Sequence, residues 1–171
     1  MPLATFAQTN QKHWFKALPP TQKKLIEQSF QLINLAKSSE YFDYSYIVMP
    51  SAKAFEGFIK DVVFDLGLIS RERYEGKRFR VGKALNPEIA RQHPDGFEIL
   101  YDDLKKLCHG ERLPALLWQA WTQCRNQVFH YFVNRPQRIS LEQAEARVHQ
   151  LVSAMEITTQ VCKIDLLRNK K

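Results

Sequence analysis

Two residues that can act together on a phosphodiester stand five positions apart in a mainly apolar stretch, Arg125 and His130. An imidazole titrates near neutral pH, so His130 can transfer a proton as a general acid or a general base. A guanidinium donates a fork of hydrogen bonds that suits phosphate oxygens. Asn126 precedes His130 by four residues, which puts both on one face of a helix. Arg125 would lie about 140° around that helix from His130, within reach of its long side chain.

A purely structural role is the alternative for these residues. A histidine on a mainly apolar helix is often half-buried and hydrogen-bonded, and a helical arginine is usually a surface charge. The spacing alone does not decide between the two interpretations.

The run from Arg125 to His130 resembles the Arg-x4-His signature of the HEPN superfamily, in which Asn commonly follows the Arg. HEPN domains are all-α bundles, and many of them are metal-independent ribonucleases. In that family the signature lies on a late helix that one further helix follows, as is predicted here. The resemblance covers about residues 20–166. It implies an all-α fold and RNA as the substrate.

A second stretch, Ser51 to Lys60, resembles the early helix of RnlA-like HEPN toxins, the RNase LS group. In those toxins an acidic residue on this helix joins the Arg and the His of the active site, which implies that role for Glu56. The alternative is a solvated glutamate that pairs with Lys60 at i,i+4. Glu56 nevertheless stands between Phe55 and Phe58, on a helix whose apolar face must pack inward.

The resemblance also implies a mechanism, in which the 2′-hydroxyl of RNA is the nucleophile and no cofactor takes part. His130 would move protons, Arg125 would stabilise charge on the phosphate, and Asn126 would orient the phosphate or the imidazole. Glu56 would hold Arg125 or His130 in position. The products would be a 2′,3′-cyclic phosphate and a 5′-hydroxyl. HEPN enzymes usually pair two such helices, which implies a homodimer with a composite active site. Relatives of the toxin kind imply an antitoxin protein as a further partner.

Helices must position these residues, and apolar residues at helical spacing predict about five of them. The predicted helices cover about residues 21–39, 46–66, 96–108, 114–133 and 140–167. Pro50 would stand in the first turn of the second helix or at a kink. Residues 1–18 are predicted to form an irregular arm, attached through Trp14 and Phe15. Residues 19–171 are predicted to form a single all-α bundle.

Residues 69–96 are predicted to form a long basic loop between the second and third helices, with a short hairpin around Phe79. The loop would guide RNA through phosphate contacts, and Tyr74 and Phe79 would be available for base stacking. The alternative is a solvated loop that Glu72 and Glu75 partly neutralise. The candidate RNA-binding residues are Arg71, Arg73, Lys77, Arg78, Arg80 and Lys83.

The composition is that of one soluble globular domain. The chain has 171 residues, a net charge of +7, and 44% apolar and 25% charged residues, which argues against extensive disorder. No apolar run approaches the length that spans a bilayer. The positive charge suits an acidic partner such as RNA. Without a recognisable signal peptide, the three cysteines are predicted to be free thiols in a reducing cytoplasm. They are Cys108, Cys124 and Cys162.

Other chemistries find no support in the sequence. The five histidines are scattered, no zinc-ligand spacing is present, and the P-loop, GxGxxG and GxSxG motifs are absent. Cys124 neighbours Arg125 but is expected to be a core thiol rather than a nucleophile. A ribonuclease of toxin or phage-defence type is thus predicted. The alternatives are a non-catalytic HEPN-like module that binds RNA or protein, and an antitoxin or regulator.

Overall fold

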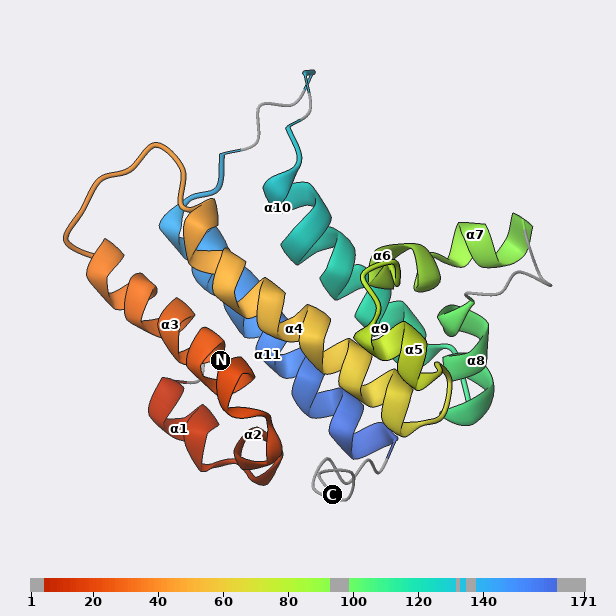
Figure 1. Ribbon diagram of the computed structural model, residues 1–171. Coiled ribbons are helices and arrows are strands. Elements are labelled where there is room, and N and C mark those ends of the chain that lie inside the picture. The colour runs from red at the N-terminus through yellow and green to blue at the C-terminus, as the bar shows by residue number, and fades with distance from the viewer. Residues whose placement is uncertain (1–4, 93–98, 132, 135–137, 163–171) are drawn as a thin grey trace.

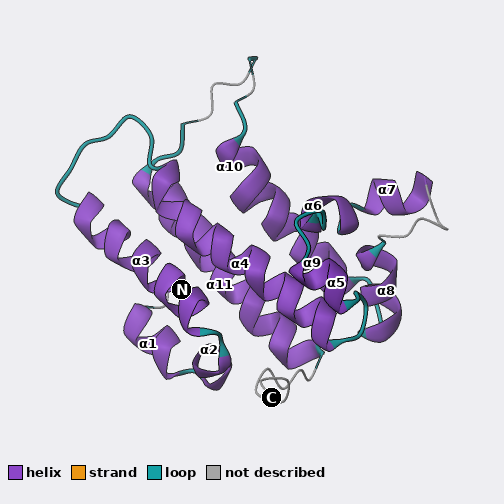
Figure 2. Ribbon diagram, in the orientation of Figure 1, coloured by secondary structure: helices purple, strands orange, loops and turns teal. Residues whose placement is uncertain are grey.

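In the computed structural model, which describes residues 5–92, 99–131, 133–134 and 138–162, all regular structure is helical (Figures 1 and 2). The predicted all-α fold is therefore confirmed. More helices form than the five that were predicted, because short helices occupy the segments interpreted as an arm and a loop. The elements are α1 (Phe6–Gln11), α2 (His13–Ala17), α3 (Pro20–Ala36), α4 (Ser45–Asp65), α5 (Arg71–Glu75), α6 (Val81–Ala84), α7 (Pro87–Gln92), α8 (Leu100–Leu107), α9 (Arg112–Trp121), η1 (Thr122–Asn126), α10 (Gln127–Phe129) and α11 (Leu141–Val161).

The centre of the fold is α4, which packs between α3 and α11 and also contacts η1 and α10 (Figure 1). The α9–η1–α10 segment runs antiparallel to α4 and α11. Helix α8 packs on α9, α7 packs on α8 and α6, and α5 packs on α4. Fully buried apolar side chains from the long helices fill the space between them. The largest of these are Phe55, Phe58, Ile26, Ile47, Ile59, Leu117, Leu151 and Met155.

The ends of the long helices follow from local sequence. Pro20 begins α3 at a position where the missing N–H costs no hydrogen bond. Ser140 caps α11 in a capping box with Gln143, in which each side chain accepts from the other residue's backbone N–H. This confirms the predicted start of the last helix. Its predicted extension over residues 163–167 lies outside the described residues.

Pro50 is the sixth residue of α4 and therefore lies beyond its first turn. The helix continues through it. The N–H of the next residue, Ser51, donates to Ser29 Oγ of α3 at 3.0 Å in a buried contact. A side chain of α3 thus satisfies a backbone donor next to the proline.

The prediction of an irregular arm over residues 1–18 is wrong for the described part, residues 5–18. Thr5 begins α1 with a capping box, and α2 follows at once. Trp14 and Phe15 are buried, and the ring of Phe15 lies 5.9 Å from that of Phe6. The predicted attachment through Trp14 and Phe15 is confirmed. Each helix is too short to show a periodic pattern, and packing against the bundle stabilises both.

The prediction of a long basic loop is also wrong in its described part, because α5, α6 and α7 occupy most of residues 71–92. No strand occurs there, so the hairpin around Phe79 is not formed. Phe79 is instead buried in the core. Tyr74 is partly buried and packs against the same core. Residues 93–98, where the next predicted helix would begin, lie outside the described residues, and α8 runs from Leu100.

Tyr74 fixes α5 on α4. Its hydroxyl donates to Asp61 Oδ1 at 2.6 Å, and its ring stacks on Phe64 with the ring centres 4.6 Å apart. Asp61 Oδ2 also accepts from Gln22 Nε2 of α3 at 2.6 Å. The hydrogen bond to Asp61, together with burial, raises the pKa of Tyr74 to about 12. Tyr74 is therefore occupied by structural contacts and not available for base stacking as predicted.

Replacing Tyr74 by phenylalanine should lower the free energy of unfolding by about 1 kcal/mol at neutral pH, because the hydrogen bond to Asp61 is lost. The raised pKa stabilises the fold below pH 10, the ordinary pKa of tyrosine, and this contribution disappears as the pH rises toward 12. The Tyr74→Phe variant should consequently lose less stability over that range. Urea denaturation at neutral and alkaline pH measures both effects. If wild type and Tyr74→Phe lost the same free energy of unfolding at alkaline pH, the stabilising role of the Tyr74–Asp61 hydrogen bond would be ruled out.

Two of the three cysteines are paired. Cys108 and Cys162 form a disulfide with a Cα–Cα distance of 5.6 Å. The prediction of three free thiols is therefore wrong for these two, because the fold brings together residues that lie 54 positions apart. The bridge joins the C-terminal ends of α8 and α11. Among the described helices, none has the length and apolar character to cross a membrane.

Candidate functional site

The segment with the predicted chemistry is not a continuous α-helix. Residues 122–126 form the wider π-helical turn η1, in which the Gln127 N–H donates to the Thr122 carbonyl five residues back. Regular helix then ends at Phe129, so the predicted helix over residues 114–133 is four residues too long. Such π turns insert one extra residue into a helix and are frequent at functional sites. Arg125 and Asn126 both belong to this turn.

Arg125 is half-buried and lies over an indole ring. Its guanidinium carbon is 5.1 Å from the centre of the Trp121 ring, a cation–π contact. Its Nη1 donates to Asn126 Oδ1 at 3.5 Å, a long hydrogen bond. These contacts orient the guanidinium while leaving most of its donors without a partner in the described residues.

The ring of Trp121 also contacts the backbone of α6. A Cβ added to Gly82 would lie 2.4 Å from Trp121 Nε1, so only glycine fits at this position. The close approach brings the basic segment against the ring that supports Arg125. The contact at Gly82 thereby joins the basic segment to the segment that carries Arg125, which the sequence did not predict to be neighbours.

The Gly82→Ala variant should lower the free energy of unfolding by about 1–3 kcal/mol, since a methyl group would overlap the buried indole. Chemical denaturation followed by circular dichroism measures the change. Lys83→Ala is the matched control, because Lys83 is an exposed neighbour in the same helix. It should remain within about 0.5 kcal/mol of wild type. Equal stability of Gly82→Ala and wild type would contradict the close packing.

His130 terminates the helix that carries Arg125. Its N–H donates to the Asn126 carbonyl at 3.2 Å, and its own backbone is extended. The side chain is exposed. Beyond it, Tyr131 and Val133 are 82% and 83% exposed, so no core surface is available for a further helical turn. The predicted shared helix face of Asn126 and His130 is thus replaced by a helix end.

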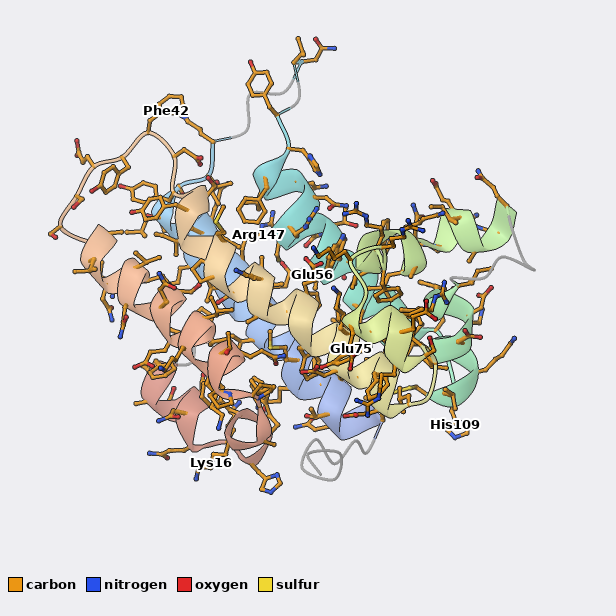
Figure 3. All side chains as sticks on the ribbon, viewed as in Figure 1. Lys16, Phe42, Glu56, Glu75, His109 and Arg147 are labelled. Atoms are coloured by element: carbon orange, nitrogen blue, oxygen red, sulfur yellow. A yellow bond between two sulfur atoms is a disulfide. The ribbon has the colours of Figure 1, made fainter. Side chains whose placement is uncertain are left out.

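Glu56 is half-buried at the edge of α4 that faces away from α3. Gly57 and Asp61 mark the opposite edge, where Gln22 of α3 meets them. Seven residues from Glu56 on the same edge, Val63 is buried. Besides α3 and α11, four shorter elements pack on α4, namely α5, α6, η1 and α10, and the last two carry the segment that leads to His130. Figure 3 labels Glu56 in the region between α4 and α9.

The structure therefore brings Arg125 and Asn126 into contact and ends their helix at His130, with Glu56 on a neighbouring helix. No hydrogen bond or ion pair joins Glu56 to Arg125 among the described residues. The predicted holding of Arg125 by Glu56 is thus not observed in this conformation.

A polar network between η1 and α11 was not predicted from the sequence. Arg147 Nη1 of α11 donates to Gln123 Oε1 at 3.2 Å and to Gln150 Oε1 at 3.3 Å, and Gln150 Nε2 donates to Gln123 Oε1 at 2.8 Å. The buried Cys124 thiol donates to Gln150 Oε1. Burial raises the pKa of Cys124 to about 12, so the thiol stays protonated at neutral pH. The prediction of a core thiol is confirmed. The available sequence signal was the i,i+3 spacing of Arg147 and Gln150.

The predicted RNA-binding residues are spread over α5, α6 and the segment between them. Three of the six line an open groove of about 900 Å³, together with Leu68 and Ile69, which follow α4. These three are Arg73, Lys77 and Arg78. Arg71 instead pairs with Glu75 at 3.4 Å, and Arg80 and Lys83 are exposed at α6. Half of the predicted RNA-binding residues therefore line one groove, and the acidic Glu72 lines it with them.

No group of three His, Cys, Asp or Glu side chains within the described ranges could hold a metal ion. Comparison of the chain with family models, with curated proteins and with solved structures finds no match.

Proposed function

We propose that this protein is a metal-independent endoribonuclease of toxin–antitoxin or phage-defence type, with a HEPN-like active site. The observation that carries the proposal is the π turn, which holds Arg125 half-buried over Trp121 and places His130 at the exposed end of the same segment. In the described residues Arg125 has no carboxylate partner, so its guanidinium suits a phosphate, and the exposed imidazole of His130 suits proton transfer to or from the reacting oxygens.

In this proposal the nucleophile is the 2′-hydroxyl of the RNA. His130 accepts its proton or donates a proton to the departing 5′-oxygen. Arg125 donates hydrogen bonds to the non-bridging oxygens as negative charge develops on them. Asn126, in contact with Arg125, orients the phosphate. Glu56, on α4, holds Arg125 or His130 in position once RNA is bound and the side chains have closed around it.

Incubation of the purified protein with single-stranded RNA, with and without EDTA, tests the proposal. Cleavage should proceed equally in both cases and should be lost in the Arg125→Ala variant. A DNA strand of the same sequence should remain intact, because it lacks the 2′-hydroxyl. Failure to cleave RNA, or cleavage that EDTA abolishes, would contradict a metal-independent ribonuclease.

A homodimer with a composite site is part of the proposal, as is an antitoxin partner in the cytoplasm. Exposed apolar side chains directly after His130, on Tyr131 and Val133, support a contact with a second copy beside the site. Light scattering should give twice the mass of the chain. A Val133→Asp variant should shift the protein toward the monomer, and a wild type that is monomeric at assay concentrations would rule out the composite site.

A non-catalytic binding module is the second candidate, and an exposed aromatic patch favours it. Tyr41, Phe42, Tyr46 and Met49 are exposed where α3 and α4 meet. Large exposed apolar patches commonly mark interaction surfaces. A binding module would retain RNA or a protein partner without forming any cyclic phosphate, so the cleavage assay separates the two functions.

A further inference from the structure

Arg147 is a half-buried cation whose described partners are all neutral. Its Nη1 donates to the amide oxygens of Gln123 and Gln150. Among the described residues, no ion pair involves Arg147 or Arg125. Two half-buried guanidinium groups on this part of the fold therefore have no carboxylate partner within the described part of the chain.

Such an arrangement is costly unless an anion neutralises it. Partial removal of a cation from water is unfavourable, and proteins usually compensate it with a paired carboxylate. Here the two glutamine amides fix one nitrogen of Arg147 and leave its other donors for a different acceptor. A guanidinium held in this way is preorganised for a tetrahedral oxyanion.

The position of Arg147 connects it to the proposed site. Gln123, which accepts from Arg147, belongs to the same π turn as Arg125 and Asn126. Helices α4, α11 and η1 pack on one another. In Figure 3 the labelled side chains of Glu56 and Arg147 both lie where α4 and α11 face the α9–α10 segment.

We propose that Arg147 binds a phosphate of the RNA strand that flanks the phosphate cleaved at Arg125 and His130. This inference rests on the proposed ribonuclease function and adds a substrate-binding residue from α11 to it. Arg147 strengthens RNA binding and does not take part in the chemical step. Its loss therefore affects KM, whereas loss of Arg125 affects kcat.

Binding of a fluorescently labelled single-stranded RNA, measured by anisotropy at several salt concentrations, tests the inference together with cleavage kinetics. Arg147→Met keeps the apolar part of the side chain, and Gln150 can still donate to Gln123. This variant should bind about tenfold more weakly and raise KM with little change in kcat. The slope of log K against log salt should fall by about 0.7, the share of one phosphate on a single strand.

Two further variants serve as controls. Arg147→Lys keeps the charge and should retain the salt slope with partial affinity. Arg112→Met removes an exposed arginine at the opposite end of α9 and should bind RNA like wild type. Circular dichroism and thermal melting check that each variant is folded.

The outcomes separate this inference from the ribonuclease proposal. Equal RNA affinity and salt slope of wild type and a folded Arg147→Met variant would overturn the inference, including the case in which neither binds. A wild type that binds RNA through Arg147 but does not cleave it would overturn only the ribonuclease proposal.

Discussion

Replacement of His130 by alanine should lower the rate of RNA cleavage by about 10²–10⁴-fold, the usual contribution of a general acid or base. His130 is exposed at the end of α10, so truncation removes little buried surface and the fold should remain intact. The loss should appear in kcat, since an imidazole that moves protons acts in the transition state. Single-turnover cleavage of a labelled RNA measures it.

The matched control for this substitution is His109→Asn. His109 lies on the turn after α8, where its φ of 55° is one that asparagine also adopts readily. Figure 3 shows it far from the labelled Glu56. This variant should cleave like wild type. Undiminished cleavage by His130→Ala, or an equal loss in both variants, would remove His130 from the active site.

Reduction of the Cys108–Cys162 disulfide should lower the free energy of unfolding by about 4 kcal/mol, the upper range expected for a loop that spans 54 positions. The bridge restricts the unfolded chain, and in the folded state it fastens the end of α11 beside α8. Urea denaturation with and without a reductant measures the difference. A double Cys108→Ser, Cys162→Ser variant should resemble the reduced protein and should not respond to the reductant.

The free thiol provides an internal check on that experiment. Cys124 is buried and unpaired, and burial raises its pKa, so oxidants should modify it slowly while the protein is folded. One thiol should react per oxidised chain after unfolding, and three after reduction. Three reactive thiols in the untreated protein, with no effect of the reductant on stability, would contradict the bridge.

The long helices could be predicted from the sequence because burial imposes a period on them. The apolar residues of α3, α4 and α11 recur at helical spacing, and Ser140 with Gln143 marks the start of α11. The short helices could not be predicted in this way. Helix α1 has six residues and α6 has four, which is too short for a period, and contacts such as that of Gly82 with Trp121 determine where they form.

The candidate site was predictable in its residue types but not in its geometry. The types and spacing of Arg125, Asn126 and His130, together with their resemblance to the HEPN signature, pointed to these residues. Nothing in the sequence distinguishes the π turn η1 from a regular α-helix. The network of Arg147 depends on side chains from separate helices, which only the fold brings together. Tyr74 and Phe79 were predicted to stack on bases because they lie among basic residues, but burial decides their role instead.

The chemical groups at the ends of the cleaved RNA decide whether the Arg125–His130 site works by attack of the 2′-hydroxyl. Mass spectrometry of the products from the wild-type protein in EDTA should find 2′,3′-cyclic phosphates and 5′-hydroxyls, with neither formed by His130→Ala. Intact RNA, or products that carry 3′-hydroxyls and 5′-phosphates, would contradict cleavage by the 2′-hydroxyl at the Arg125–His130 site.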